Sequence, residues 1–144
     1  MGINYGGSKA AELNRAGEFE RAIVAADEAL AADGADPEPL VERAHALAQL
    51  ERYDEAVADL EKARALDAKT QLLDDDLLDD AFFSALLGAA RNLAARDAEA
   101  GARLLARYTS HFPSGTHASE VVEWQRRLRG EVRREFVKRR IEDA

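Results

Sequence analysis

The chain of 144 residues contains no cysteine and only three prolines. The absence of cysteine excludes disulfides and cysteine-based zinc sites, and the small number of prolines is compatible with helix along most of the chain. No apolar run approaches the roughly 20 residues that a membrane-spanning helix needs. The first residues lack the apolar core of a signal peptide. We therefore expect a cytoplasmic protein without a membrane partner.

The composition is dominated by alanine, leucine, glutamate, aspartate and arginine. Alanine and the straight-chain residues among them lose little rotamer freedom in a helix, so the composition favours an all-α fold. Hydrophobic residues make up 47% of the chain and charged residues 33%, which is typical of a globular protein rather than a disordered one. We expect a single domain over residues 1–144.

The formal net charge of −8 is unevenly distributed along the chain. Residues 1–120 contain 12 basic and 23 acidic side chains, which give a net charge of −11. Residues 121–144 contain 8 basic and 5 acidic side chains, which give +3. Because Lys and Arg neutralise phosphates in nucleic-acid complexes, the acidic body disfavours non-specific binding to RNA or DNA.

Residues of the same class recur 34 positions apart in the first half of the chain. The matched pairs are Ala10 and Ala44, Leu13 and Leu47, Phe19 and Tyr53, Glu20 and Asp54, Ala22 and Ala56, Ile23 and Val57, Ala29 and Ala63, and Asp33 and Asp67. We interpret the small residues as positions where two helices approach closely, and the larger ones as filling the seam between them. The aromatic residues of the series, Phe19 and Tyr53, each follow a turn and close the base of a hairpin. The period therefore predicts a helical hairpin that occurs twice.

This pattern resembles the tetratricopeptide repeat (TPR) family, whose unit is a helical hairpin of about 34 residues. The resemblance implies a right-handed α-solenoid of three such hairpins, followed by a long C-terminal helix. Repeat 1 would cover residues 3–36 and repeat 2 residues 37–70. Arg43 departs from the family pattern, in which leucine is common at this position.

A third, less regular repeat follows if the interval grows to 44 residues. The matched pairs are then Ala44 and Gly88, Ala56 and Ala100, and Leu60 and Leu104. This repeat would cover residues 81–114, with helices at 81–95 and 97–111. The acidic insertion before it, residues 71–80, either extends the first of these helices or forms a separate short helix, with Thr70 as the N-cap.

The segment 115–144 is predicted to contain one long helix, from His117 to about Arg140. An apolar stripe recurs along it at helical spacing. About 24 residues make this helix about 36 Å long, against about 21 Å for a hairpin helix, so that its first half closes the helical array and its second half projects. We interpret four residues of the stripe as a second interface and expect a homodimer through it. These residues are Trp124, Leu128, Val132 and Phe136.

Residues 74–80 contain the pattern Asp75-Asp76-x-x-Asp79, which resembles the magnesium-diphosphate motif of prenyl-transferring enzymes. Such enzymes need a larger helical cavity and usually a second acidic motif, and neither is visible in the sequence. We interpret the run as a solvated face or as a partner for arginine side chains. The serines and histidines form no recognisable catalytic or metal-binding set, so we expect no catalytic residues, no metal and no cofactor.

The arginine-rich C-terminal helix suggests an alternative function, the binding of RNA or DNA. Its basic residues are Arg126, Arg127, Arg129, Arg133, Arg134, Lys138, Arg139 and Arg140. The acidic body opposes the approach of phosphates, and the aromatic residues among these basic ones are limited to Trp124 and Phe136. We rank nucleic-acid binding below protein binding, and a small magnesium-dependent enzyme below both.

The resemblance to the TPR family also implies a binding surface, because in that family the first helix of each hairpin lines a concave groove that receives peptides. The corresponding residues are Val41, Glu42, His45, Gln49, Phe82, Ala85, Leu86 and Ala89. Family members that bind acidic carboxylate tails use Lys, Arg and Asn at this surface, and this chain has Glu38 and Glu42 instead. We therefore expect a non-catalytic adaptor, scaffold or secretion-chaperone-like module that binds an apolar or basic peptide or helix. The alternative is a surface that the chain's own N-terminus covers or that stays exposed.

Overall fold

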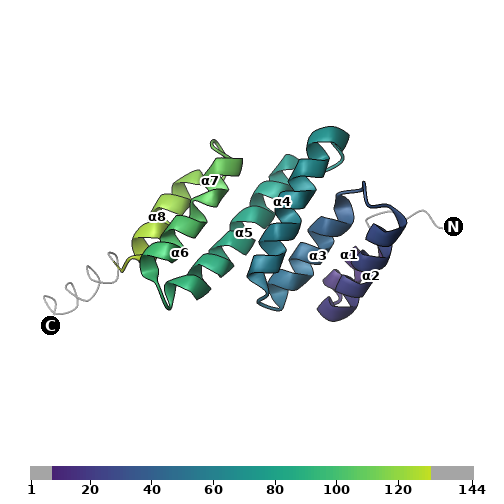
Figure 1. Ribbon diagram of the computed structural model, residues 1–144, viewed down its shortest axis with the longest axis horizontal. Coiled ribbons are helices and arrows are strands. Elements are labelled where there is room, and N and C mark those ends of the chain that lie inside the picture. Colours follow the sequence, from purple (N-terminus) through teal and green to yellow (C-terminus); the bar gives the residue numbers. More distant parts are fainter. Residues whose placement is uncertain (1–7, 131–144) are drawn as a thin grey trace, which may run out of the picture. The chain divides into compact units, whose positions relative to one another are not determined.

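The computed structural model describes residues 8–130 (Figure 1), which form helices with no strand among them. In chain order the helices are α1 (Lys9–Arg15), α2 (Phe19–Ala32), α3 (Glu38–Gln49), α4 (Tyr53–Thr70), α5 (Asp75–Ala94), α6 (Ala98–Leu105), α7 (Arg107–His111) and α8 (Ala118–Leu128). The expected all-α character is confirmed for this part of the chain. Within residues 8–130, no helix combines the length and the apolar character needed to cross a membrane.

The chain divides into two compact units, Met1–Ala85 and Leu86–Ala144, where the sequence predicts one domain. The boundary lies inside α5, which contributes its N-terminal part to the first unit and its C-terminal part to the second. We name them unit 1 and unit 2 and describe each by itself.

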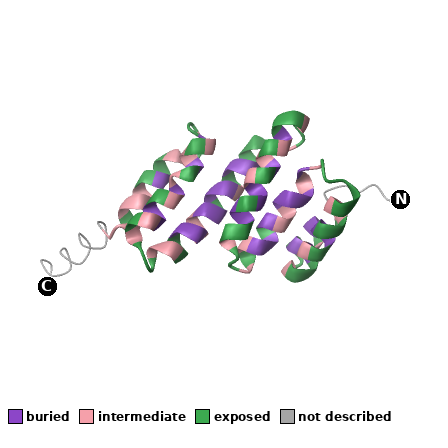
Figure 2. Ribbon diagram, in the orientation of Figure 1, coloured by how far each residue is buried: buried purple, intermediate pink, exposed green. Residues whose placement is uncertain are grey.

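Unit 1 is built from helices that pack on their neighbours in the chain (Figure 1). The packed pairs are α1 with α2, α2 with α3, and α3 with α4, and α1 also contacts α3. Its fully buried side chains are both small and large, among them Ala22, Ala26, Leu40 and Leu60. Figure 2 colours the buried residues of the helices purple. Alanines allow neighbouring helix axes to approach closely, and leucines fill the remaining space.

The turn inside each hairpin of unit 1 repeats after 34 residues. Gly17 and Glu51 follow the first helix of their hairpins and adopt φ angles of +77° and +61°. In each turn the amide of this residue donates to a carbonyl three positions earlier, and the next amide donates to a carbonyl five positions earlier. This pair of hydrogen bonds defines the Schellman motif, which ends a helix with one residue in the left-handed region. The helices that follow begin at the aromatic residues Phe19 and Tyr53.

Exchanging the residues at these two equivalent turns should change stability in opposite directions. Glu51 has a Cβ atom in the left-handed region, where glycine is favoured, so we expect Glu51→Gly to increase the free energy of unfolding by about 0.5–1 kcal/mol. Gly17→Ala introduces the same strain into the first turn and should decrease it by about 1 kcal/mol. Urea denaturation followed by far-UV circular dichroism measures both changes. If both substitutions changed the free energy of unfolding in the same direction, the left-handed conformation of Gly17 and Glu51 would be contradicted.

Arg43 of α3 holds aspartates from the two neighbouring helices. Its guanidinium donates through Nε and Nη2 to both carboxylate oxygens of Asp59 on α4, each at 2.8 Å, and through Nη1 to Asp27 on α2, also at 2.8 Å. The side chain of Asp59 is 11% exposed and that of Arg43 26%. The hydrogen bond to Asp59 raises the pKa of Arg43 above its ordinary value. A polar bridge thus joins three consecutive helices at the position where the TPR family commonly has leucine.

The connection from α4 to α5 differs from the prediction that Thr70 caps a following helix. Thr70 is the last residue of α4, and Gln71 after it adopts the left-handed conformation with φ +53°. Asp67, which is buried, accepts a hydrogen bond from the amide of Leu73 at 2.8 Å and so fixes the loop. The α5 helix begins at Asp75, next to Asp74, whose carboxylate accepts from the amide of Asp76. Most of the acidic insertion therefore extends α5.

The helices of unit 2 differ from the predicted third repeat in register and continuity. The predicted second helix, 97–111, is divided into α6 and α7 at Ala106. Its buried residues Gly101, Leu105 and Tyr108 lie 45 positions after Ala56, Leu60 and Ala63, which are also buried, whereas the predicted interval is 44. The turn before it is also different, because Asp97 caps α6 by accepting from the amide of Ala100.

Gly101 marks a close approach between α6 and the end of α5. A Cβ atom at this position would lie 2.6 Å from the carbonyl oxygen of Ala90 and 2.7 Å from the Cβ atom of Ala94. Side-chain Cβ atoms do not approach backbone atoms this closely, so that only glycine fits.

The α8 helix is shorter than the predicted helix from His117 to Arg140. It ends at Leu128, and Gly130 adopts a φ angle of +85° and donates its amide hydrogen to the carbonyl of Arg127 at 3.0 Å. A glycine in this conformation is a frequent helix stop, and the expectation of an uninterrupted helix is therefore wrong. Val132 and Phe136 lie outside the described residues.

The packing of α8 on α6 and α7 organises unit 2. The hydroxyl of Tyr108, which is fully buried, accepts from the amide of His117 at 2.9 Å. Gln125 of α8 donates through Nε2 to the carbonyl oxygen of Ala102 on α6 at 2.8 Å. Arg129 forms a bidentate ion pair with Glu99 on α6, which lowers the pKa of the Glu99 carboxyl below its ordinary value.

Candidate peptide-binding groove

A groove of about 350 Å³ crosses unit 1 along α1, α3 and the N-terminal part of α5. Each of these helices contributes one face, with residues spaced three or four positions apart as helical geometry requires. The residues that line it include Asn14 on α1, Val41, Glu42 and His45 on α3, and Leu77 and Ala81 on α5. The three helices α1, α3 and α5 therefore share one surface.

The polar part of the groove centres on Asn14, of which only 8% is exposed. Its side-chain amide donates to the carbonyl oxygen and to the carboxylate Oε1 of Glu42, both at 2.9 Å. Because both partners are acceptors, the NH₂ group of Asn14 must face Glu42, which leaves Oδ1 on the other side. Oδ1 is buried and has no hydrogen-bond partner among the described residues. A buried acceptor without a partner is energetically unfavourable, and Asn14 lines the groove, so its Oδ1 is a candidate acceptor for a ligand N–H group that reaches it.

The apolar part of the groove is formed by Leu77 and the small residues beside it. The Leu77 side chain is 54% exposed, which is unusual for leucine within the described residues. Val41 is nearly buried beneath the groove surface, and Ala81 lies one helical turn after Leu77. A ligand that covered Leu77 would remove apolar surface from water, which is the principal driving force of association.

Unit 1, in which the groove lies, has a negative net charge, although Arg15 is also among the residues that line the groove. Residues 8–85 contain 8 basic and 20 acidic side chains, which give a net charge of −12. At the start of α3, burial raises the pKa of the Glu38 carboxyl, and the nearby charges of Asp36 and Glu42 raise it further. A net negative charge of this size favours cationic ligands and repels carboxylates.

The structure brings together five of the predicted groove residues, Val41, Glu42, His45, Gln49 and Ala85. His45 and Gln49 are exposed, and Glu42 is half-buried. Phe82, Leu86 and Ala89 do not line the groove, because they lie on the buried side of α5, with Phe82 and Leu86 fully buried.

The sequence did not predict several residues that line the groove, and three of them matter for ligand binding. They are Asn14, which the repeat pattern does not single out, and Leu77 and Ala81, which lie in or next to the acidic insertion. The signal that could have found Leu77 is its position four residues before Ala81 on a helix extended by the insertion.

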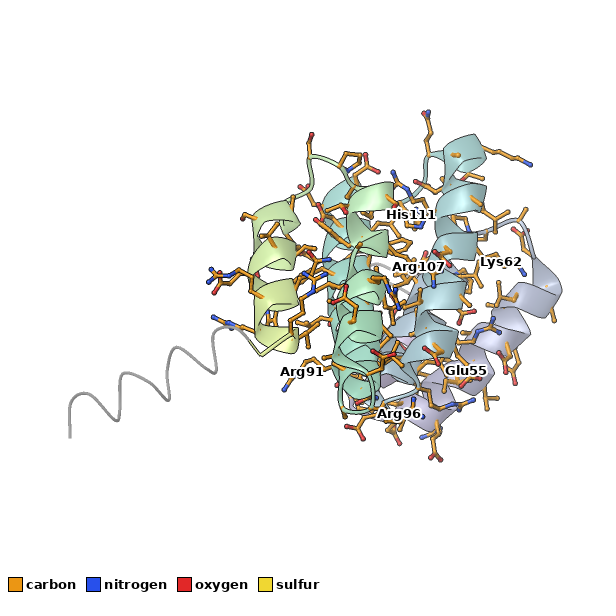
Figure 3. All side chains as sticks on the ribbon, turned by 60° about the vertical axis from the view of Figure 1, so that its left-hand side comes forward. Glu55, Lys62, Arg91, Arg96, Arg107 and His111 are labelled. Carbon is orange, nitrogen blue, oxygen red and sulfur yellow. The ribbon has the colours of Figure 1, made fainter. Side chains whose placement is uncertain are left out.

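The second predicted interface is only partly described. Trp124 is half-buried and lies between the guanidinium groups of Arg91 and Arg127, whose Cζ atoms are 5.5 and 5.0 Å from its ring centroid. Leu128 is also half-buried. Other basic side chains of unit 2 project from α7, where Arg107 and His111 lie one turn apart (Figure 3).

The three aspartates of the magnesium-like pattern differ in their environments. Asp75 and Asp76 are exposed in the first turn of α5, whereas Asp79 is 5% exposed. Acidic residues in the first turn of a helix interact favourably with its positive end, which gives Asp75 and Asp76 a structural role.

Comparison with protein-family models, with curated proteins and with solved structures finds no match for this chain. The chemistry of the groove is therefore inferred from its own residues.

Proposed function

We propose that the chain is a non-catalytic protein-interaction module whose groove on α1, α3 and α5 binds an apolar and basic peptide segment of another protein. The observation on which this depends is the exposed Leu77 beside the partnerless acceptor of Asn14, within a unit of net charge −12. An adaptor or scaffold in the cytoplasm is the setting that we propose for this activity.

The architecture supports a TPR-like assignment as part of this proposal. The hairpin turns at Gly17 and Glu51 share their φ region and hydrogen bonds at the family's interval. The groove is lined mainly by α1, α3 and α5, the first helices of the proposed hairpins. Helical repeats commonly present their binding surface in this way.

The residues of the groove favour a particular ligand chemistry. The NH₂ group of Asn14 is engaged by Glu42, so that it is not available to a ligand carboxylate. Its Oδ1 suits a guanidinium, ammonium or backbone N–H group. Leu77 suits an aliphatic or aromatic side chain of the same ligand.

Leu77→Lys should weaken binding of an apolar and basic peptide by about tenfold or more. The substitution removes apolar contact area and places a positive charge opposite the ligand. Fluorescence anisotropy with labelled peptides of equal length, one apolar and basic, one apolar and acidic and one polar and neutral, measures the effect. We expect the parent chain to bind the first of these most tightly.

Val24→Lys is the matched control. Val24 is 55% exposed on α2, so the substitution has the same change of charge and starts from nearly the same exposure without touching the groove. It should leave the affinity within about twofold of the parent. Equal loss in the two variants, or tightest binding of the acidic peptide, would refute the proposed function.

A further inference from the structure

We infer that the groove of unit 1 receives the segment 132–140 of a second copy of this chain, so that the protein associates with itself head to tail. The inference rests on the proposed function and specifies the partner. The inference combines the residue types of this segment, read from the sequence, with the described residues of the groove.

Charge complementarity is the first argument for this partner. Residues 132–140 contain five basic side chains and one acidic one, for a net charge of +4, whereas residues 8–85 have a net charge of −12. Near the start of α3, burial and, to a lesser extent, the charges of Asp36 and Glu42 raise the pKa of the Glu38 carboxyl. Opposite potentials of this size accelerate encounter and orient the two surfaces.

The segment also supplies the groups that the groove lacks. Val132, Phe136 and Val137 offer apolar side chains to cover Leu77. Its arginines each present five N–H donors, and one such donor would satisfy the buried Oδ1 of Asn14. The ligand chemistry deduced from the groove is thus found within this chain itself.

The α8 helix ends before this segment begins. The helix stops at Leu128, and Gly130 follows in a conformation that favours glycine. The part of the predicted apolar stripe that lies on α8 therefore ends at Leu128. We assign the segment to a second copy; docking of the segment within its own chain would instead leave the parent chain monomeric.

The contact joins two different surfaces and is therefore heterologous. A pair retains one free groove, on one chain, and one free segment, on the other, so that a third chain can add unless a ring closes. We expect the average mass of the parent chain to exceed 15.8 kDa and to rise with concentration. Salt should lower it, because ionic strength screens the charges involved.

Light scattering coupled to size exclusion tests the inference with full-length variants. Leu77→Lys disables the groove, and Phe136→Asp disables the segment, so each variant alone should be monomeric. Mixed, they should form a complex of two chains, because the intact segment of the first fits the intact groove of the second. Val24→Lys and Val122→Asp, at positions 55% and 60% exposed, are the matched controls and should behave as the parent.

Three results would overturn the inference. They are a parent chain that is monomeric at every concentration, an oligomer that survives Leu77→Lys, and a mixture of the two variants that remains monomeric. The last result, with an oligomeric parent, would indicate a symmetric contact between two C-terminal segments instead.

A peptide titration distinguishes failure of this inference from failure of the proposed function. A labelled peptide of residues 131–144 is added to the Phe136→Asp chain, whose groove is intact. Binding that weakens about tenfold on addition of Leu77→Lys supports the inference. If this peptide does not bind while an unrelated apolar and basic peptide does, the groove function stands and the inference is wrong. If neither binds, both are wrong.

Discussion

Gly101→Ala should lower the free energy of unfolding by about 2–3 kcal/mol, although alanine is the better helix former. The added Cβ atom would lie within 2.9 Å of three atoms of α5, two of them backbone atoms of Ala90 and Ala94. Backbone atoms of a helix move only if the whole helix moves, so α6 must shift away from α5 and lose packing. The intrinsic preference of about 1 kcal/mol for alanine over glycine in a helix does not offset this loss.

The matched control is Gly34→Ala, at a glycine where a Cβ atom would meet only the carbonyl oxygen of Leu30 at 3.6 Å. This substitution should leave stability unchanged or slightly increased. Thermal denaturation followed by circular dichroism compares the two variants, and Gly101→Ser provides a second case of the same clash. A Gly101→Ala variant as stable as the Gly34→Ala variant would disprove the close approach of α5 and α6.

Arg43→Leu should lower the free energy of unfolding by about 2–3 kcal/mol, although leucine is the residue that the resemblance to the TPR family would place here. Removal of the guanidinium leaves the carboxylate of Asp59, whose side chain is 11% exposed, without its bidentate partner. Breaking one half of a largely buried ion pair is costly because the remaining charge stays desolvated.

The double variant Arg43→Leu with Asp59→Leu should recover most of the loss and come within about 1 kcal/mol of the parent. Apolar side chains of similar size replace both members of the largely buried pair, and the carboxylate that loses its partner, Asp27, is 53% exposed and stays solvated. The control is Arg52→Leu, which breaks the exposed pair with Glu55 and should leave the urea midpoint unchanged. If the changes in the free energy of unfolding of the two single variants add up to that of the double variant, Arg43 and Asp59 have no coupling energy.

The fold of unit 1 could be predicted from the sequence because its repeat combines local and tertiary signals. Phe19 and Tyr53 begin α2 and α4 at the expected interval, and the matched alanines at positions 22 and 56 are fully buried. The left-handed conformation of Glu51 could not be predicted from its side chain. It follows from the hairpin geometry, which requires this conformation at the same place as Gly17.

Prediction was less successful after residue 70, where single residues decide between alternatives. Thr70 is a plausible N-cap by type, but Gln71 enters the left-handed region and ends α4 instead. Gly130 lies within a strongly amphipathic pattern, and that pattern obscured its role as a helix stop. In both cases one residue at a helix end outweighs the periodicity of its neighbours.

The prediction of the groove residues depended in a similar way on the position of single residues. On α3, the expected residues His45 and Gln49 are exposed and line the groove. On α5, Phe82 and Leu86 were expected to do so and are buried, whereas Leu77 and Ala81 line it. Each residue turns a helix by about 100°, so an error of one position in the register of the third repeat exchanges an exposed face for a buried one.

The packing of each helix of unit 1 on its chain neighbours also has a consequence for how this part of the protein folds. Contacts between neighbours close only short loops, and proteins dominated by such contacts fold in microseconds to milliseconds. The turn of the α1–α2 pair is completed by Glu18, but both helices also pack on α3, where Asn14 donates to Glu42. During synthesis, the first hairpin is therefore expected to become stable once α3 is available to cover it, and later helices then add to a surface that already exists.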